Sequence, residues 1–599
     1  MSGDAPTIDT LLNVSASLRG RRWVLRAADD AETGRIAREN RIDDLLARLL
    51  AVRGVSADEA AAFLEPRLRD HFPDPSSFQD MDLAASRIWD AVEAKRSITV
   101  FADYDVDGAT SAAQLILWLR SQGIEAGHYV PDRIEEGYGP NLDAFKRLHA
   151  EGTDLVITVD CGAAAHETLN AAAEMGLDVI VIDHHLMDED FPKALALVNP
   201  NRPDDSSGCG HMAAAGVTFI LLAALNREGR RRGRFEAGEE PDILAWSDLA
   251  ALGTICDVVP LTGINRALVA TGLKVMSRWQ SPGLAALADI AGVEGVATPY
   301  HAGFLLGPRI NAGGRVGQAD LGTRLLTRNE PDELKTIAGH LDRFNAERKA
   351  IEADVLDGAL AQLEGQAQGR SVLIAAEDGW HPGVIGVVAG RIKEKYAKPA
   401  IIIGIDRQAS PPIAKGSGRS VPGVNLGGAI VAAREAGLLL AGGGHEMAAG
   451  LSADPDRLTE LSAFLDDYLS GELARAEAAR QFELDALLTI PAATLELCDR
   501  LAALAPYGQG MPEPRFALAG VRVSYAKRVG SDHVRATLSS PDGAKLQAIA
   551  FRCADEPLGE ALLSASSSKW HVAGRLSINS WQGRNSVQLQ IEDMASADD

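Results

Sequence analysis

Short, continuous apolar runs alternate with amphipathic stretches along the first half of the chain. Residues 97–101, 155–159 and 179–182 are rich in Val and Ile, and the segments between them repeat apolar positions at helical spacing. Continuous apolar strands separated by helices are typical of a parallel sheet that is buried on both faces. The pattern therefore predicts an α/β domain, which we place at residues 76–325.

The rest of the chain divides by pattern into four further segments. Residues 1–75 carry apolar positions at helical spacing and are predicted as a helical lead-in. A long helical stretch without an internal proline predicts a connecting helix within 326–370, and a new apolar run opens a second α/β domain at 371–475. The tail, 476–599, holds several short strand-like runs, which favour a small β-barrel.

Composition narrows the class of protein. Five scattered cysteines with no CxxC pair fit a reducing compartment and disfavour a disulfide framework or a structural zinc site. We recognise no secretory signal and no apolar run near the roughly 20 residues of a membrane span, so we expect a cytoplasmic protein without membrane association. The formal net charge of −24 disfavours wholesale nucleic-acid binding. It says little about one groove, because metal ligands contribute to the total.

The predicted strands of the first domain end in acidic or imidazole side chains. Three strands and one helical run are followed by a set of eight such residues: Asp103, Asp105, Asp107, Asp160, Asp183, His184, His185 and Asp257. In an open parallel sheet, ligands bind in the crevice beyond the carboxyl ends of the strands. The pattern therefore makes this edge of the sheet the candidate functional site.

Each of these acids, taken alone, is better interpreted as a helix cap or a turn former. Together they are not, because aspartates at alternate positions on one loop repel one another unless a cation lies between them. Carboxylates with one or two imidazoles and no thiolate favour Mn²⁺ or Mg²⁺ over zinc. Four or more carboxylates exceed the need of one ion, so the set predicts two ions, as in two-metal phosphoryl transfer.

Seven motifs in a fixed order resemble a known superfamily. The first four resemble the DHH phosphoesterases, and the last three resemble their partner domain, DHHA1: residues 103–108, 160–162, 183–185 and 253–260, then 379–386, 416–420 and 442–450. Within the superfamily, the chain length and the β-rich tail with residues 504–510 resemble the RecJ family of bacterial 5′→3′ single-stranded-DNA exonucleases. The resemblance spans roughly residues 20 to 595.

The resemblance implies a fold and an activity. The fold would be α/β, with a parallel-sheet DHH domain and a DHHA1 α/β domain joined by a long helix, plus a C-terminal OB-fold barrel that binds single strands. The activity would be metal-dependent hydrolysis of single-stranded DNA to mononucleotides, in DNA repair and recombination. Single-strand-binding protein and a RecQ-type helicase are the implied partners, and we expect a monomer.

The resemblance also assigns roles at the metal site. Asp105 and Asp107 would bind one ion each, Asp160 would bridge the two, and His184 and Asp257 would complete the second ion. Three further residues are assigned to catalysis. His185 would contact the scissile phosphate or the attacking water. Asp103 would be either a ligand or an orienting acid, and Asp183 would either hold a histidine or serve the fold.

Nucleic-acid contacts are predicted in three glycine-containing loops. The first carries Arg309, Asn311 and Arg315, and an ordinary surface loop is its alternative. In the second, Ser417, Arg419 and Ser420 could ring an anion, such as a terminal phosphate. In the third, His445 would approach the scissile nucleotide, unless it is a structural histidine in a turn.

Two other regions carry weaker signals for DNA. The basic run 227–234 is interpreted as a solvated linker, with a non-specific DNA contact as the alternative. The tail offers aromatic residues that could stack on bases, although most of them are expected in the core: Tyr507, Phe516, Tyr525, Trp570 and Trp581.

Two other functions stay open. An inactive DNA-binding scaffold would have lost metal ligands, yet all five predicted ligands are present. A phosphodiesterase of oligonucleotides or cyclic dinucleotides, or a pyrophosphatase, would not need the β-rich tail. A length series of labelled single strands separates these alternatives from an exonuclease.

Overall fold

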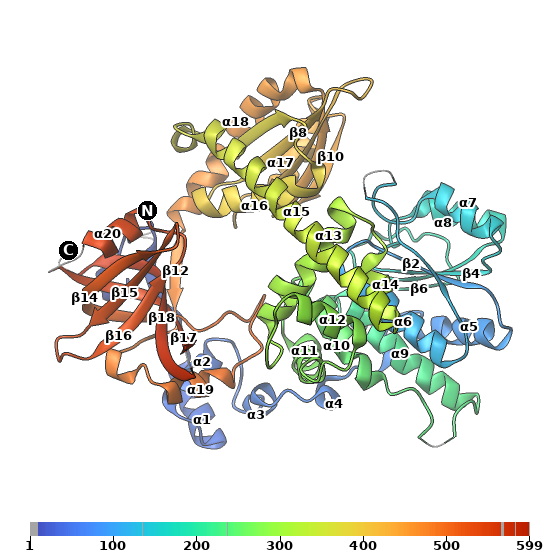
Figure 1. Cartoon of the computed structure of the whole chain (residues 1–599), viewed down its shortest axis with the longest axis horizontal. Helices are drawn as coiled ribbons and strands as arrows, with labels where there is room; N and C mark the ends of the chain where they lie inside the picture. Colours follow the sequence, from blue (N-terminus) through green and yellow to red (C-terminus); the bar gives the residue numbers. More distant parts are fainter. Residues whose placement is uncertain (1–9, 134–135, 237, 565–567, 582, 598–599) are drawn as a thin grey trace, which may run out of the picture. The chain divides into compact units, whose positions relative to one another are not determined.

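The computed structural model describes residues 10–133, 136–236, 238–564, 568–581 and 583–597 (Figure 1). The chain divides into two compact units. One unit combines the N-terminal segment up to Phe72 with Val258–Thr271 and the chain from Arg480. The other unit contains Pro73–Asp257 and Gly272–Ala479. The candidate metal ligands and the three predicted DNA-binding motifs all belong to this second unit.

The first sheet of that unit is parallel throughout, in the order β3-β2-β4-β5-β6. Its strands are β2 (Ile98–Ala102), β3 (Gly127–Tyr129), β4 (Leu155–Val159), β5 (Asp178–Ile182) and β6 (Ala196–Val198). β2 and β4 are buried at every position, which explains their unbroken apolar sequences. The predicted parallel α/β domain is confirmed, while the edge strands β3 and β6 are too short to leave a pattern.

Helices pack around this sheet, and a glycine lets three of them, α6, α9 and α10, approach one another closely. The helices of this domain include α5 (Met81–Glu93), α6 (Val106–Ser121), α7 (Leu142–Ala150), α8 (His166–Met175), α9 (Ala214–Arg231), α10 (Ser247–Cys256), α12 (Pro282–Ile290), α13 (Gly307–Val316) and α14 (Leu321–Thr327). A Cβ atom at Gly253 on α10 would lie 2.4 Å from Thr110 Oγ1 on α6 and 2.5 Å from Ala215 Cβ on α9. The absence of a side chain there lets the three helices approach one another closely.

The predicted connecting helix is confirmed as α15 (Pro331–Leu363), which leads into a five-stranded sheet of order β10-β11-β9-β8-β7. β7 and β8 pair in parallel, and the remaining pairs are antiparallel. The elements of this domain are β7 (Leu373–Asp378), α16 (Pro382–Tyr396), β8 (Ala400–Asp406), β9 (Ile413–Arg419), α17 (Leu426–Glu435), β10 (Ala441–His445), β11 (Ala448–Ala453) and α18 (Leu458–Ala478).

Both glycine-rich motifs of this domain were predicted as loops, and that prediction is wrong. Residues 416–419 lie within β9, and residues 442–450 form most of the β10–β11 hairpin. A Cβ atom at Gly418 would lie 2.7 Å from Leu426 Cδ2, and one at Gly416 would lie 2.9 Å from Leu451. These glycines serve close packing in a sheet, a role that the sequence does not separate from turn formation.

Two basic segments also differ from prediction. Residues 309–315, predicted as a loop, form most of α13. The run 227–234 begins in the last turns of α9, where Glu228 pairs with Arg231 and Arg232. Arg227 and Arg234 likewise pair with acids of the same unit, Asp74 and Glu93. This run is therefore neither a linker nor a free basic patch, since its charges are neutralised within the fold.

The tail forms the predicted barrel. Its strands follow the order β13-β14-β15-β16-β18-β17 and close through a β14–β17 pairing. The strands are β13 (Ala486–Leu487), β14 (Phe516–Val529), β15 (His533–Ser539), β16 (Lys545–Ala550), β17 (Lys569–Trp581) and β18 (Arg584–Ser596), accompanied by α19 (Leu495–Ala502) and α20 (Pro557–Ser564). β15 leaves only a weak strand pattern in the sequence, because it alternates small apolar residues with polar ones.

The N-terminal segment was predicted to be helical, but it also contains a strand. It contains α1 (Asp30–Asn40), α2 (Asp44–Ala51), α3 (Ala60–Leu64), α4 (Leu68–His71) and also β1 (Arg22–Leu25), which pairs in parallel with β12 (Gln481–Leu484). Trp23 on β1 is fully buried and donates a hydrogen bond of 3.1 Å to Asp593 of β18. The segment is thus part of the same unit as the barrel, and only its residues 1–9 lie outside the described part.

Two expectations from composition can be compared with the described residues. No helix among them is long and apolar enough to cross a membrane. All five cysteines carry free thiols, as the absence of a paired motif predicted.

We predict that Gly253→Ala lowers the apparent melting temperature, because the added methyl group would overlap atoms of α6 and α9. Overpacking of this kind costs about 1–3 kcal/mol. The matched control is Gly471→Ala on an exposed face of α18, where the nearest atom to a new Cβ is 3.7 Å away at the end of a flexible arginine. The control should stabilise by about 0.5–1 kcal/mol. Equal melting temperatures for the two variants would contradict this packing argument.

Candidate metal centre and phosphate pocket

The backbone aligns three aspartates at one edge of the first sheet. The amides of Asp103, Asp160 and Asp183 donate to the last carbonyl of the neighbouring strand, at 3.4, 3.0 and 3.0 Å. Each aspartate therefore follows its strand in register with the next one. Asp160 has a left-handed φ of +60°, a strained conformation that aspartate tolerates better than most residues and that is found often at functional sites.

The loop after β2 turns directly into α6. Asp105 caps the helix, since one of its carboxylate oxygens accepts from the amides of Asp107 (2.8 Å) and Gly108 (3.1 Å). Gly108 is required here, because a Cβ atom would lie 2.3 Å from the carbonyl oxygen of Asp103. Asp105 is thus a helix cap, as its sequence position alone suggests. The cap uses one of its two carboxylate oxygens and leaves the other for a ligand.

Asp107 is held at the start of α9. Its two oxygens accept from the amides of Ala214 (2.7 Å) and Ala215 (2.9 Å), and the side chain is buried. Burial and the neighbouring Asp257 and Asp105 raise its pKa well above the usual range. The first turn of α9 fixes this carboxylate but does not neutralise it.

The other acids are also crowded. Burial, together with nearby carboxylates, raises the pKa of Asp160 strongly and the pKa values of Asp103 and Asp257 to about 7. Oδ1 of Asp103 is buried and has no hydrogen-bond partner among the described residues. The protein alone therefore leaves this cluster electrostatically unfavourable when it is ionised.

His184 presents a free nitrogen to the acids. Its Nδ1 lies 3.1 Å from the carbonyl oxygen of Met212, which places the ring proton on Nδ1. Nε2 is then an acceptor, yet it lies 3.3 Å from Asp160, 3.7 Å from Asp257 and 3.8 Å from Asp107. Burial and the adjacent imidazole lower the pKa of His184 to about 4, so this nitrogen keeps its lone pair at neutral pH.

Asp183 serves the second histidine. Its Oδ1 lies 2.7 Å from His185 Nδ1, and Oδ2 accepts from the Ala163 amide at 2.9 Å. Burial opposes its charge, but the hydrogen bonds and the His185 ring more than compensate and hold its pKa at about 2. Tyr138 closes this group, because its hydroxyl lies 3.3 Å from the His185 ring and 3.2 Å from the carbonyl oxygen of Asp160. Sequence reasoning missed Tyr138, whose one local signal is its place between two glycines.

Seven described residues of this edge form overlapping clusters. Three groups each bring one ligand atom per residue within 4.8 Å of the others: Asp103, Asp105 and Asp160; Asp107, His184 and Asp257; and Asp160, His184 and His185. Asp160 and His184 each belong to two groups. All five predicted metal ligands therefore meet at one place with Asp103 and His185, and Asp183 adjoins them through His185.

The chemistry of the donors fits a divalent cation. The lone pair of His184 Nε2 faces three carboxyl oxygens, and when these are ionised the arrangement is repulsive unless a cation converts it into ligation. Oxygen donors dominate, and no thiolate takes part: burial raises the pKa of the nearby thiols of Cys161 and Cys256, which keeps them protonated. Hard divalent ions prefer such donor sets.

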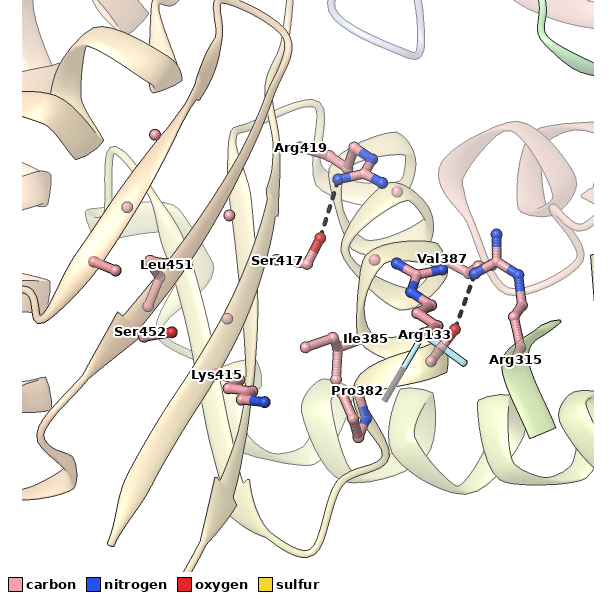
Figure 2. Close-up of a pocket in the computed structure, with 18 residues that line it drawn as sticks. Arg133, Arg315, Pro382, Ile385, Val387, Lys415, Ser417, Arg419, Leu451 and Ser452 are labelled. Atoms are coloured by element: carbon pink, nitrogen blue, oxygen red, sulfur yellow. Dashed lines mark hydrogen bonds between the residues drawn. The ribbon is translucent and has the colours of Figure 1, made fainter. Parts of the chain in front are cut away.

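A basic pocket of about 810 Å³ lies in the same unit, between α16 and the sheet of the second α/β domain. Figure 2 shows Arg133 between Arg419 and Arg315 in this view, and Lys415 lies further along β9, the strand that also carries Arg419. These four cations have no acidic residue beside them in the described lining, and the N-terminal turn of α16 adds Pro382 and Gly383. Such a surface attracts anions, above all phosphate.

Three of the predicted residues, Ser417, Arg419 and Arg315, line this pocket. Arg419 donates to the hydroxyl of Ser417 at 3.1 Å, which orients both polar groups (Figure 2). Burial and the neighbouring Arg133 lower the pKa of Arg419. Arg315 also lines the pocket and donates to the Gly383 carbonyl at 2.9 Å, while burial lowers its pKa to about 10. A bound anion would relieve this crowding of positive charge.

Other predicted contacts are placed differently. Ser420 is fully buried and its hydroxyl donates to the Val424 carbonyl at 2.7 Å, so its predicted DNA contact is wrong. Asn311 accepts from the Val106 amide at 3.0 Å, and Arg309 pairs with Asp342 at 2.9 Å. These contacts favour a supporting role for both residues over the predicted DNA contact. His445 is exposed at the end of β10 and does not line the pocket.

Comparison with known proteins gives a consistent assignment. Three family models match in order: "DHH family, N-terminal domain" at residues 97–254, "DHHA1 domain" at 369–471 and "RecJ OB domain" at 484–593. Two proteins named single-stranded-DNA-specific exonuclease RecJ are similar over most of both chains. The one from Dickeya dadantii is 36% identical over 92% of this chain and 95% of its own, and the one from Escherichia coli is 32% identical over 95% and 98%.

A solved structure agrees with the sequence matches. This chain is similar to the crystal structure of RecJ from Thermus thermophilus in complex with Mn²⁺. The match covers 96% of this chain and 79% of the RecJ chain, with a TM-score of 0.78 and 31% sequence identity. The domain order, the near-complete coverage and the shared fold lead to one conclusion: the chain belongs to the RecJ family of DHH phosphoesterases.

Proposed function

We propose that this protein is a single-stranded-DNA-specific exonuclease that hydrolyses phosphodiester bonds with two divalent ions, Mn²⁺ or Mg²⁺. The observation that carries the proposal is the cluster of buried carboxylates around the free nitrogen of His184. The activity is that of the RecJ proteins to which the chain is similar, and Mn²⁺ and Mg²⁺ are the ions named for solved RecJ structures.

We assign the ligands from the overlapping groups. Asp107, His184 and Asp257 would hold one ion, Asp105 and Asp103 would face the other, and Asp160 would bridge the two. Bound there, the ions would activate water and stabilise the charge of the leaving oxygen. The amides at the start of α9 fix Asp107, and the Met212 carbonyl fixes the His184 ring.

His185 is the residue that we place beside the reacting phosphate. Asp183 accepts a hydrogen bond from Nδ1–H, which leaves Nε2 as the nitrogen that would contact the phosphate or the attacking water. Asp183 thereby acts as a positioning residue, and the Tyr138 hydroxyl lies 3.3 Å from both nitrogens of the same ring. The side chain of His185 is 46% exposed, so a substrate can reach it.

The basic pocket would bind the terminal phosphate of the strand. Four cations surround a space with backbone amides and the Ser417 hydroxyl, and none is neutralised by an acid of the described lining. Because this pocket and the metal cluster are joined by α13, a strand end held at Arg315 would have a defined distance to the metals. Capture of a 5′-phosphate, and hence 5′→3′ polarity with release of mononucleotides, is the family expectation that we adopt.

The barrel would carry the rest of the strand. Tyr525 is 54% exposed on β14, and the exposed Lys527 and Arg535 face each other on β14 and β15. Phe516 is in the core, and the Tyr507 hydroxyl bonds to the Leu501 carbonyl, so these two predicted aromatics serve the fold. The side chain of Trp581 lies outside the described residues.

Several expectations stay predictions for this chain. They are the binding of single-strand-binding protein and a RecQ-type helicase, the monomeric and cytoplasmic state, the role in DNA repair and recombination, and the domain boundaries at residues 75, 325, 370 and 475. An inactive scaffold is disfavoured because all predicted ligands are present and clustered. A phosphodiesterase of small substrates is disfavoured by the match to the RecJ OB domain.

Asp160→Asn should reduce cleavage of a single strand more than about 100-fold, beyond the loss typical of a ligand's outer partners. The variant should also lose the rise in melting temperature that Mn²⁺ gives the wild type, because ligand binding to the folded state stabilises it. Asp178→Asn, at the opposite end of the neighbouring strand, is the control and should retain both properties. Wild-type turnover by Asp160→Asn would show that the ligand assignment is wrong.

Substrate form gives a second test. A 5′-overhang should be digested up to the duplex, whereas a blunt duplex and a 3′-overhang should resist. The physical reason is that Asp107 and Asp160 are almost fully buried, so a phosphate must leave a base-paired helix to reach them. Denaturing gels of duplexes labelled at the 3′-end of the tested strand measure this. Efficient digestion of the blunt duplex would contradict the proposal.

Arg419→Ala should weaken binding of 5′-phosphorylated strands by about 1.5–3 kcal/mol, the range for a hydrogen bond to a charged group. The loss should shrink on 5′-hydroxyl strands, which lack the partner anion, and also at high salt. Affinities measured in EDTA prevent cleavage from interfering. Arg407→Ala is a charge-matched control, since Arg407 is exposed and pairs with Asp378. Equal losses on both strand types would place end recognition elsewhere.

A further inference from the structure

Two exposed aromatic rings stack on each other beside the candidate metal centre. Tyr300 is 59% exposed and Phe304 is 69% exposed, and their ring centroids lie 5.4 Å apart with an interplanar angle of 20°. They are one helical turn apart at the start of the helix that continues as α13. Exposed aromatic side chains cost solvation free energy, so an exposed pair indicates a binding surface.

Packing does not explain why these positions are aromatic. The segment η4 (His301–Leu306) is π-helical, and its small residues make the contact with α10. A Cβ atom at Gly303 would lie 3.3 Å from Ile255, and one at Gly307, the first residue of α13, would lie 2.4 Å from the Cys256 sulfur. The glycines thus let η4 and the start of α13 lie directly on α10, while the two rings remain in solvent. π-helical turns occur frequently at functional sites.

Another aromatic pair provides a contrast. Phe464 and Tyr468 on α18 are also one turn apart and stacked, at 5.9 Å and 25°. Phe464, however, is partly buried against the hydrophobic core of its domain, so that pair has an anchoring role. Neither Tyr300 nor Phe304 is buried in this way. The α18 pair is therefore a matched control for the effect of a stacked pair on stability.

The location of the pair connects it to the proposed active site. η4 packs on the last turn of α10, and Asp257 follows that turn directly as its C-cap. On its other side, η4 continues into α13, where Asn311 holds the metal-binding loop and Arg315 lines the basic pocket. A strand that reaches the metal cluster would pass close to η4.

We propose that Tyr300 and Phe304 form a stacking platform for the bases of single-stranded DNA next to the metal centre. The inference rests on the proposed function and adds a base-binding site to it. Base–aromatic stacking is tolerant of sequence, because every base has a π-face. Stacking also requires bases that are free of a complementary strand, so the platform would contribute to selection of single strands.

The test compares strands with and without bases. The probes are a 3′-labelled 16-mer of thymidylate and an abasic 16-mer with the same phosphates, with binding followed by fluorescence anisotropy in EDTA. Tyr300→Ala/Phe304→Ala should weaken binding of the thymidylate strand at least about fivefold, the lower bound for the loss of one stacked base. It should change binding of the abasic strand less than about twofold.

Two further variants guard against an effect on folding. Phe304→Leu keeps an apolar side chain but has no π-face, so it should also lose affinity for the base-bearing strand at an unchanged melting temperature. Phe304→Trp should retain wild-type affinity. Tyr468→Ala, from the α18 pair, should leave binding of both strands unchanged.

Each outcome decides the inference. Equal losses on the two strands, or no loss on thymidylate, would overturn the platform. A change in oligomeric state without a change in DNA affinity would instead make the pair a protein-binding surface, which also overturns it. Digestion of the thymidylate strand by the wild type in Mn²⁺ tests the proposed function separately, because that activity can persist when the platform fails.

Discussion

Repulsion among buried negative charges is the constraint on which the rest of this structure depends. Five aspartates form overlapping clusters, three of them around one imidazole nitrogen, and burial raises the pKa of four of the five. The described protein supplies amide donors at Asp105 and Asp107, which fix these carboxylates but do not neutralise the cluster. The arrangement becomes favourable once divalent cations bind, and the surrounding fold serves to hold it until they do.

The scaffold keeps these groups close in three ways. Strand register aligns the aspartates that follow β2, β4 and β5. Glycines at positions 108 and 253 let backbone and helices approach the cluster where any side chain would collide. Helix α13 then connects the metal-binding loop, through Asn311, with the phosphate pocket, through Arg315. A shift of this helix would therefore change both halves of the site at once.

The local distribution of charged side chains matches the proposed function, although the net charge of the chain does not reveal it. The net charge of −24 would suggest a poor DNA-binding protein. Much of the conspicuous basic run at the end of α9 is neutralised by Glu228 and Glu93, whereas the less conspicuous Arg133, Arg315, Lys415 and Arg419 share one pocket. Local arrangement, not composition, thus decides where a phosphate would bind.

The sequence alone determined the parallel sheet, the connecting helix, the barrel and the set of metal-binding candidates. These features leave local patterns: continuous apolar strands, helical periodicity, and acids directly after strands. Tertiary structure alone decided which residues face a ligand. Ser420 follows Arg419, the last residue of β9, but is buried, and its hydroxyl donates to the Val424 carbonyl instead of facing the pocket. Arg133 and Tyr138 reach the site from a loop without regular pattern. In the glycine-rich motifs, Gly416, Gly418 and Gly442 lie where a Cβ atom would meet side chains of other elements, and such contacts exist only after the chain has folded.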